Sequence, residues 1–192
     1  MVLANNQPKS GSSMLTLAIL RHAKSDWDAP ADDDFDRPLH PRGQAAAPLA
    51  GEMIATLGLK PSLILCSSAK RTRETLDVAM PEMKLPSHTE IVTDDKLYLA
   101  SFMTLIEVLR ETRDVHKCVL IIGHNPGLHE FAVALAGSGE TGPLTAMQDR
   151  FPTAALAVME FKRSHWRDIR SGDGRLAAFW TPKKGLETGP RR

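Results

Sequence analysis

Two histidines in this chain directly follow apolar runs, and the first stands beside an arginine. Arg21 and His22 come after the run Leu15 to Leu20, and Lys24 follows two residues later. Arginine offers an oxyanion a planar fork of donors, and a neutral imidazole nitrogen can act as a nucleophile. These residue types at this spacing favour an anion site, and phosphate is the obvious anion. The alternative at this point is that Arg21 and His22 only lead the chain into solvent.

His124 repeats the situation of His22, because it follows the apolar run 117–122. Pro126 is well placed to start a helix two residues later. Another cation, Arg71, falls in the first turn of a helix predicted from 69 to about 80, with Ser67 and Ser68 as its cap. Basic residues there oppose the helix dipole, which indicates a bound anion, although they could also be ordinary exposed helix residues.

Alternating strands and helices must position these residues. The sequence predicts strands at 15–20, 61–66, 90–92, 117–122, 155–161 and 176–180, and helices at 42–57, 69–80, 101–113 and from 126 onward. In such α/β proteins, side chains from different strand ends converge on one crevice. We therefore expect a three-layer α/β/α sandwich with a mostly parallel central sheet, and we expect the last two strands to form an antiparallel pair at its edge.

Length and composition predict a single domain. We expect 1–13 to be a disordered extension, 14–182 the domain and 183–192 a flexible basic tail. The formal net charge of +1 argues against nucleic-acid and membrane partners. Cys66 and Cys118 lie in apolar runs and are expected to be buried free thiols. With no signal peptide and no apolar run near the ~18 residues of a membrane span, a cytoplasmic location is expected.

The aspartate-rich stretch, one glycine-rich run and four histidines are expected to be structural and not part of a site. Residues 25–41 contain six aspartates without the glycine and final glutamate of a calcium loop, which predicts a surface loop. The GSGETG run at 137–142 matches a dinucleotide-binding fingerprint but follows a helix, so a flexible loop is expected. Four remaining histidines are expected at the surface: His40, His88, His116 and His165.

Three motifs in order resemble the histidine phosphatase superfamily, in its phosphoglycerate mutase-like branch, and most of all the SixA-like phosphohistidine phosphatases. They are LRHAKS at 20–25, SSAKRTRET at 67–75 and IIGHNPGL at 121–128. RPLHPRG at 37–43 and a closing hairpin with Trp166 add to the resemblance.

The resemblance implies that His22 is the nucleophile and accepts the phosphoryl group. Arg21, Arg71 and His124 would hold the phosphoryl oxygens and stabilise the transition state. We count Lys24, Ser25 and Asn125 as further phosphate- or substrate-binding residues. No metal or other cofactor is implied, because cationic side chains would supply the positive charge.

Two departures from the family pattern bear on the substrate. Ala23 replaces the usual glycine of the signature, and the general acid of larger relatives is missing. One branch carries that acid in a Leu-x-Glu segment, where this chain has Leu97-Tyr98-Leu99, and another carries an Asp where this chain has Asn125. General acid catalysis is typically worth about 100-fold or more. We therefore expect phosphohistidine on a protein or another phosphate with a good leaving group, although Asp26 or Asp28 could still donate a proton.

Other readings stay open. The chain could be a phosphate-binding regulatory module with little turnover, or a small-molecule phosphomonoesterase. A metal hydrolase using His22, His124 and His129 is disfavoured, because His124 and His129 are five residues apart and not four. The expected partner is phosphate or a phosphorylated substrate, for example a histidine-phosphorylated signalling protein.

Overall fold

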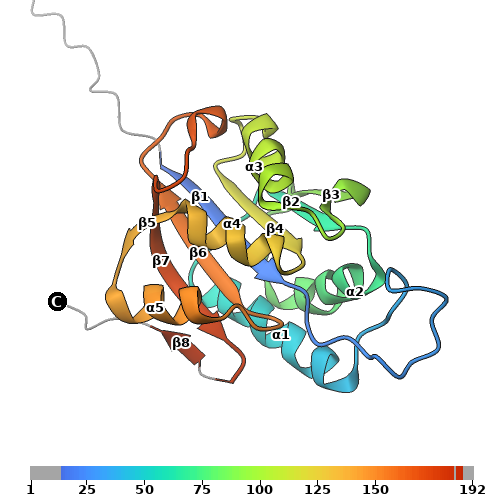
Figure 1. Cartoon of the computed structure of the whole chain (residues 1–192). Coiled ribbons are helices and arrows are strands. Elements are labelled where there is room, and N and C mark those ends of the chain that lie inside the picture. Colours follow the sequence, from blue (N-terminus) through green and yellow to red (C-terminus); the bar gives the residue numbers. More distant parts are fainter. Residues whose placement is uncertain (1–13, 184, 188–192) are drawn as a thin grey trace, which may run out of the picture.

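In the computed structural model, which describes residues 14–183 and 185–187, a mixed sheet of eight strands carries helices on both faces (Figure 1). The strands are β1 (Leu15–Arg21), β2 (Leu63–Ser67), β3 (Glu90–Asp94), β4 (Cys118–Gly123), β5 (Ala136–Gly139), β6 (Leu156–Phe161), β7 (Gly174–Thr181) and β8 (Gly185–Glu187). Their order is β3-β2-β4-β1-β6-β7-β5, and β8 pairs with β7.

Parallel pairing joins β3, β2, β4 and β1, and it also joins β5 to β7. β6 runs antiparallel to both β1 and β7. The predicted antiparallel pairing of 155–161 with 176–180 is confirmed. β5 and β8 both pair with β7 and extend this end of the sheet, where β6 and β8 run antiparallel to β7.

The helices form two layers. They are α1 (Pro41–Thr56), α2 (Lys70–Ala79), α3 (Phe102–Glu111), α4 (Gly127–Leu135) and α5 (Thr141–Asp149). Along β1, Leu17 and Ile19 face a core that includes Phe131 of α4, whereas Ala18 faces a second core that includes Ile54 of α1. This alternation buries both faces of the sheet, and the predicted three-layer sandwich is confirmed.

The GSGETG stretch is not a loop. Its first residues belong to β5, and its last two begin α5. A Cβ atom at Gly137 would lie 1.8 Å from the carbonyl oxygen of Gly172, so the glycine there permits close backbone contact at a sheet edge.

The structure also bears on the expected ends of the domain. Part of the predicted tail, Gly185–Glu187, pairs with β7, and the predicted extension at 1–13 lies outside the described residues.

His116 is buried and not at the surface, because its carbonyl oxygen accepts a 2.6 Å hydrogen bond from the Trp166 indole and ties it to the core. Both cysteines are free, Cys66 buried and Cys118 partly so.

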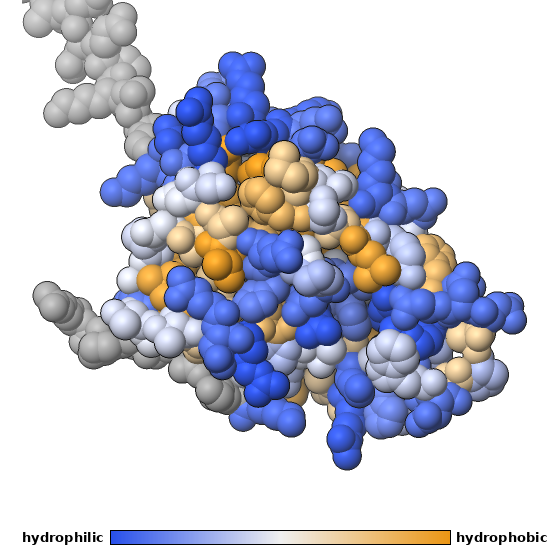
Figure 2. Space-filling view, in the orientation of Figure 1, coloured by the Kyte–Doolittle hydropathy of each residue, from blue (hydrophilic) through white to orange (hydrophobic). Residues whose placement is uncertain are grey.

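The surface in the view of Figure 2 is mostly hydrophilic, with hydrophobic side chains gathered in the middle of this face. Among the described residues, no helix has both the length and the apolar character needed to cross a membrane.

Candidate active site

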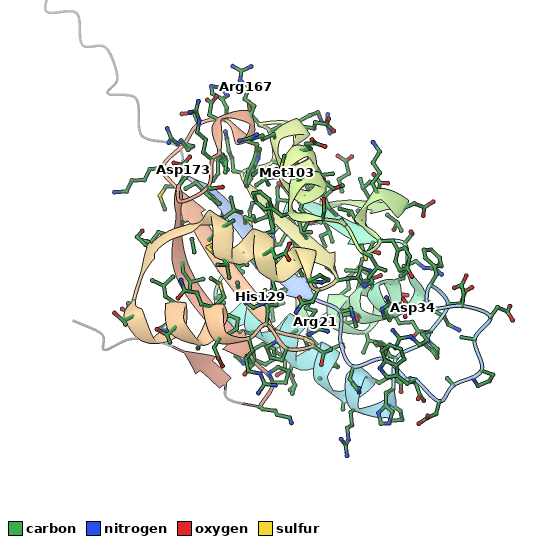
Figure 3. The ribbon with its side chains drawn as sticks, viewed as in Figure 1. Arg21, Asp34, Met103, His129, Arg167 and Asp173 are labelled. Carbon is green, nitrogen blue, oxygen red and sulfur yellow. The ribbon has the colours of Figure 1, made fainter. Side chains whose placement is uncertain are left out.

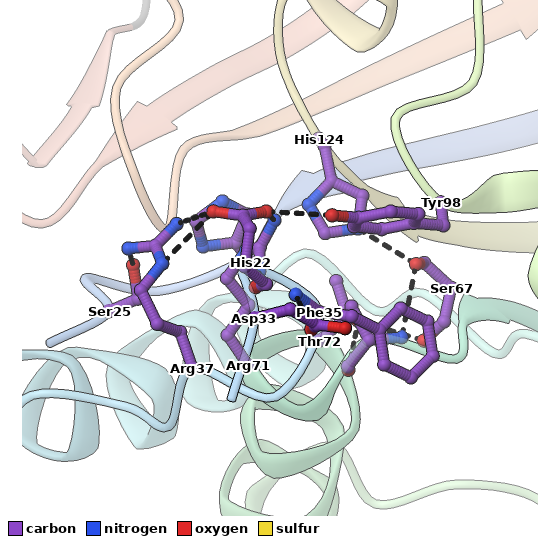
Figure 4. Close-up of polar contacts among 12 residues, drawn as sticks. His22, Ser25, Asp33, Phe35, Arg37, Ser67, Arg71, Thr72, Tyr98 and His124 are labelled. Atoms are coloured by element: carbon purple, nitrogen blue, oxygen red, sulfur yellow. Dashed lines mark hydrogen bonds and ion pairs between the residues drawn. The ribbon is translucent and has the colours of Figure 1, made fainter. Parts of the chain in front are cut away.

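The ends of β1 and β4 bring His22 and His124 together. These strands are parallel neighbours in which Arg21 pairs with Gly123, so the next residue of each leaves the sheet at the same level. The backbone N–H of His22 donates to the carbonyl oxygen of Gly123 at 3.1 Å. The two imidazole centroids are 5.1 Å apart (Figure 4).

The His22 ring is held in one neutral tautomer. Its Nδ1 lies 2.7 Å from the carbonyl oxygen of Ala23, which can only accept a hydrogen bond, so Nδ1 carries the proton. Burial lowers the pKa of His22 well below 6.5, and the charges of Arg71 and Arg21 lower it further. Nε2 is therefore left with an available lone pair. The Ala23 N–H donates to Thr75 Oγ1 at 3.0 Å and fixes this backbone.

His124 is buried and paired on one side only. Its Nε2 lies 2.8 Å from Ser67 Oγ, and its Nδ1 has no hydrogen-bond partner among the described residues. Burial, followed by the charge of Arg71, lowers the pKa of His124 to about 3. The prediction that Ser67 and Ser68 cap α2 is wrong: the N-cap is Ala69, without a side-chain hydrogen bond, and Ser67 contacts His124 instead.

Arg71 points from the first turn of α2 to a carboxylate in the aspartate-rich loop. Its side chain is 2% exposed, and Nη2 lies 2.8 Å from Asp34 Oδ2. Arg37 Nη2 lies 2.7 Å from Asp34 Oδ1, and the Tyr98 hydroxyl donates to Oδ2 at 2.9 Å. Burial raises the pKa of Asp34, but hydrogen bonds from Tyr98 and Arg37 and the Arg71 guanidinium outweigh it and lower that pKa to about 2.

Arg21 and Asn125 meet at one carbonyl oxygen. Arg21 Nη1 and Asn125 Nδ2 each donate to the carbonyl oxygen of Phe151 at 2.9 Å. Arg21 Nε and Asn125 Oδ1 are buried and have no partner among the described residues. Figure 3 shows Arg21 near the end of β1, with Asp34 in the loop beyond it.

The two other predicted binding residues have different surroundings. Ser25 Oγ accepts a 2.6 Å hydrogen bond from Arg37. Lys24 is exposed and lines a cavity of about 500 Å³ between α1 and the segment after α5, together with Arg42 and Arg150. The structure thus gathers His22, Arg71 and His124, whereas Lys24 faces a neighbouring cavity.

Three residues of the candidate active site were not predicted from the sequence: Asp34, Arg37 and Tyr98. Arg37 opens the RPLHPRG motif, and Tyr98 directly precedes Leu99, which stands where the family carries the missing Glu, so both had a signal. Asp34 is one of six aspartates in its loop and nothing in the sequence separates it from the others. The suspected donor Asp26 accepts from the backbone N–H of Asp28 at 3.0 Å, in the exposed part of the loop.

The arrangement suits oxyanion chemistry. A neutral imidazole with a free nitrogen stands beside guanidiniums that can hold oxygens. Within 14–183 and 185–187, no three His, Cys, Asp or Glu side chains gather in a way that could hold a metal ion. His129, considered above as a metal ligand, instead contacts the protein backbone: its Nε2 is 2.8 Å from the Met147 carbonyl oxygen.

Comparison with known proteins shows the family. The Histidine phosphatase superfamily (branch 1) profile matches residues 17–98. An uncharacterized protein of Mycobacterium tuberculosis is 34% identical over 171 residues, covering 85% of this chain and all of that protein. A crystal structure from Agrobacterium tumefaciens, assigned as a phosphohistidine phosphatase SixA, is 30% identical with a TM-score of 0.71, covering 88% of this chain and 98% of that one. The chain belongs to the histidine phosphatase superfamily.

A third comparison supports the fold alone. The protein histidine phosphatase SixA complexed with tungstate superposes with a TM-score of 0.70 at 23% identity, over 88% of this chain and 98% of that one. That protein therefore shares the sandwich described above.

Proposed function

We propose that this protein is a phosphatase that forms a covalent phosphohistidine on His22. The observation that carries the proposal is the neutral tautomer of His22, with Nδ1–H held by the Ala23 carbonyl and the Nε2 lone pair available. In the first step a bond forms between Nε2 and phosphorus while the bond from phosphorus to the leaving group breaks. Water then attacks the phosphohistidine, and the products are phosphate and the free imidazole.

Cationic side chains hold the phosphoryl oxygens in this proposal. Arg71 and Arg21 each lower the pKa of His22, so both charges act at its ring. Their guanidiniums would stabilise the charge of the transition state without a metal or other cofactor. His124 is neutral before substrate binds, and a phosphate dianion would raise its pKa and draw a proton to it.

The ionisation state of Asp34 supports a substrate with a good leaving group. Asp34 is ionised at neutral pH because its pKa is about 2, so it has no proton to give to a leaving group. An alkoxide departs poorly without a proton, whereas the imidazole of a phosphohistidine departs readily. We therefore propose phosphohistidine on a protein as the substrate, with a histidine-phosphorylated signalling protein as the partner. A cytoplasmic location stays a prediction.

The test compares three substrates: a phosphohistidine peptide, p-nitrophenyl phosphate and a sugar phosphate, all in EDTA. Wild type should hydrolyse the phosphohistidine peptide at least ~100-fold faster than the sugar phosphate, the size of the missing general-acid contribution. His22→Asn should abolish this activity, and His88→Asn, at an exposed histidine, should not. Preference for the sugar phosphate would instead indicate a phosphomonoesterase, and phosphate binding without turnover a regulatory module.

A further inference from the structure

The carboxylate of Asp34 has the hydrogen-bonding partners that a phosphoryl group would need. Its two oxygens contact Arg71 of α2, Arg37 of the aspartate-rich loop, and Tyr98 after β3, at 2.7 to 2.9 Å. The Arg71 guanidinium also donates to the Asp34 backbone carbonyl. Figure 4 shows Arg37, Arg71 and Tyr98 in one cluster with His22 and His124. A carboxylate and a phosphate take the same charge-assisted hydrogen bonds from arginine, so they compete for it.

We propose that Asp34 is an internal substitute for the substrate phosphate, and that a phosphorylated substrate binds by displacing it from Arg71 and Arg37. This rests on the proposed function, because it requires Arg71 to hold the phosphoryl group. Asp34 is then a specificity-determining residue, since only an anion that binds these arginines better than a carboxylate can enter.

Displacement of the Asp34 carboxylate from the arginines favours a phosphoryl dianion over a monoanion. Asp34 brings one charge and two oxygens, and its side chain remains 41% exposed although Arg71 is 2% exposed. A phosphoryl group brings a further charge and a third oxygen. Buried donor positions beside this carboxylate lack partners among the described residues, namely Arg71 Nε and His124 Nδ1 when it is protonated. A monoanion offers no such gain over the carboxylate already in place.

Charge repulsion disfavours a phosphoryl group and the Asp34 carboxylate on the same guanidinium. Like charges at hydrogen-bond distance from one guanidinium repel each other, and the fraction of molecules with Asp34 displaced scales the apparent affinity for phosphate. Arg71 also donates to the Asp34 backbone carbonyl, and we infer that a phosphoryl group taking over this guanidinium releases that bond too and frees the backbone of the segment.

The test is calorimetric titration of inorganic phosphate into wild type, Asp34→Asn and Asp36→Asn. The first variant keeps the side-chain shape and removes the charge; the second removes the same charge from an exposed neighbour in the loop. Asp34→Asn should bind phosphate about tenfold more tightly, and Asp36→Asn should bind it like wild type. Unchanged or weaker binding by Asp34→Asn, in a variant that melts like wild type, would overturn the proposal, because Asp34 would then only position the arginines.

Amide hydrogen exchange provides a second readout that a positioning role would not give. Phosphate should accelerate exchange at 33–37 in wild type, since the segment is released, and leave it unchanged in Asp34→Asn. Protection of these amides by phosphate in wild type would contradict displacement. Neither measurement depends on turnover. If wild type does not hydrolyse phosphohistidine but Asp34→Asn binds phosphate more tightly, the proposed substrate is wrong and this inference stands.

Discussion

At the scale of single residues, the site depends on keeping two imidazoles neutral among guanidiniums. Burial is the largest cause of the lowered pKa at both His22 and His124, and nearby arginines add to it. A nucleophile gains from this state, because a protonated ring has no lone pair to attack phosphorus. The same state has a cost in stability at acid pH.

That cost leads to a pH prediction. Between the ordinary histidine pKa of 6.5 and the folded value of about 3 at His124, the unfolded chain binds more protons than the folded protein. The free energy of unfolding should therefore fall as pH drops below about 6.5, by up to ~1.4 kcal/mol per pH unit for each such histidine.

Urea unfolding of wild type and His124→Gln between pH 7.5 and 5 measures this slope. In His124→Gln the slope of the free energy of unfolding against pH should be smaller by close to the contribution of one histidine. His88→Gln is the control, because the His88 ring is exposed and its substitution should leave the slope as in wild type. A His124→Gln slope equal to that of wild type would contradict a neutral His124.

At the scale of elements, the start of α1 supports the segment that follows His22. Gly43 lies in the first turn of α1, and a Cβ atom there would be 2.1 Å from the Lys24 carbonyl oxygen. The same oxygen accepts a 2.9 Å hydrogen bond from the His40 N–H. Only glycine allows the helix to approach this backbone so closely.

Gly43→Ala should therefore lower the free energy of unfolding by about 1–3 kcal/mol and reduce turnover, because the backbone after His22 must shift. Gly142→Ala is a matched control in α5, where a Cβ atom would meet nothing within 4 Å. It should be neutral or slightly stabilising, since alanine favours helix. Denaturant titration measures the free energy of unfolding of both variants. Equal values for Gly43→Ala and Gly142→Ala would contradict the close contact of Gly43 with the Lys24 backbone.

The elements that sequence could predict are those with strong apolar patterning. β1, β2 and β4 are buried on both faces and read as continuous apolar runs, and α1 and α2 lie within a residue or two of their expected bounds. β5 and α5 were missed because their glycines and polar residues resemble a loop. Their structure depends on tertiary contacts, such as that of Gly137 with Gly172.

At the scale of the whole molecule, one sheet serves two cores, which supports the proposed single domain. With a formal net charge of only +1, attraction for phosphate must come from the local cluster of arginines. The positions of His22, Arg21, Arg71 and His124 were predictable because each lies at a strand end or helix start. The contacts of Asp34 were not, since they join Arg71 and Tyr98 from distant parts of the chain and no local pattern encodes them.

The most direct test of the account is to trap the phosphorylated enzyme. Wild type is mixed with a ³²P-labelled phosphohistidine peptide in EDTA, quenched in alkali within milliseconds, and digested. An acid-labile, alkali-stable label is expected on the peptide that contains His22, and none in His22→Asn. Turnover that continues with no label on His22, or with label on another residue, would contradict it.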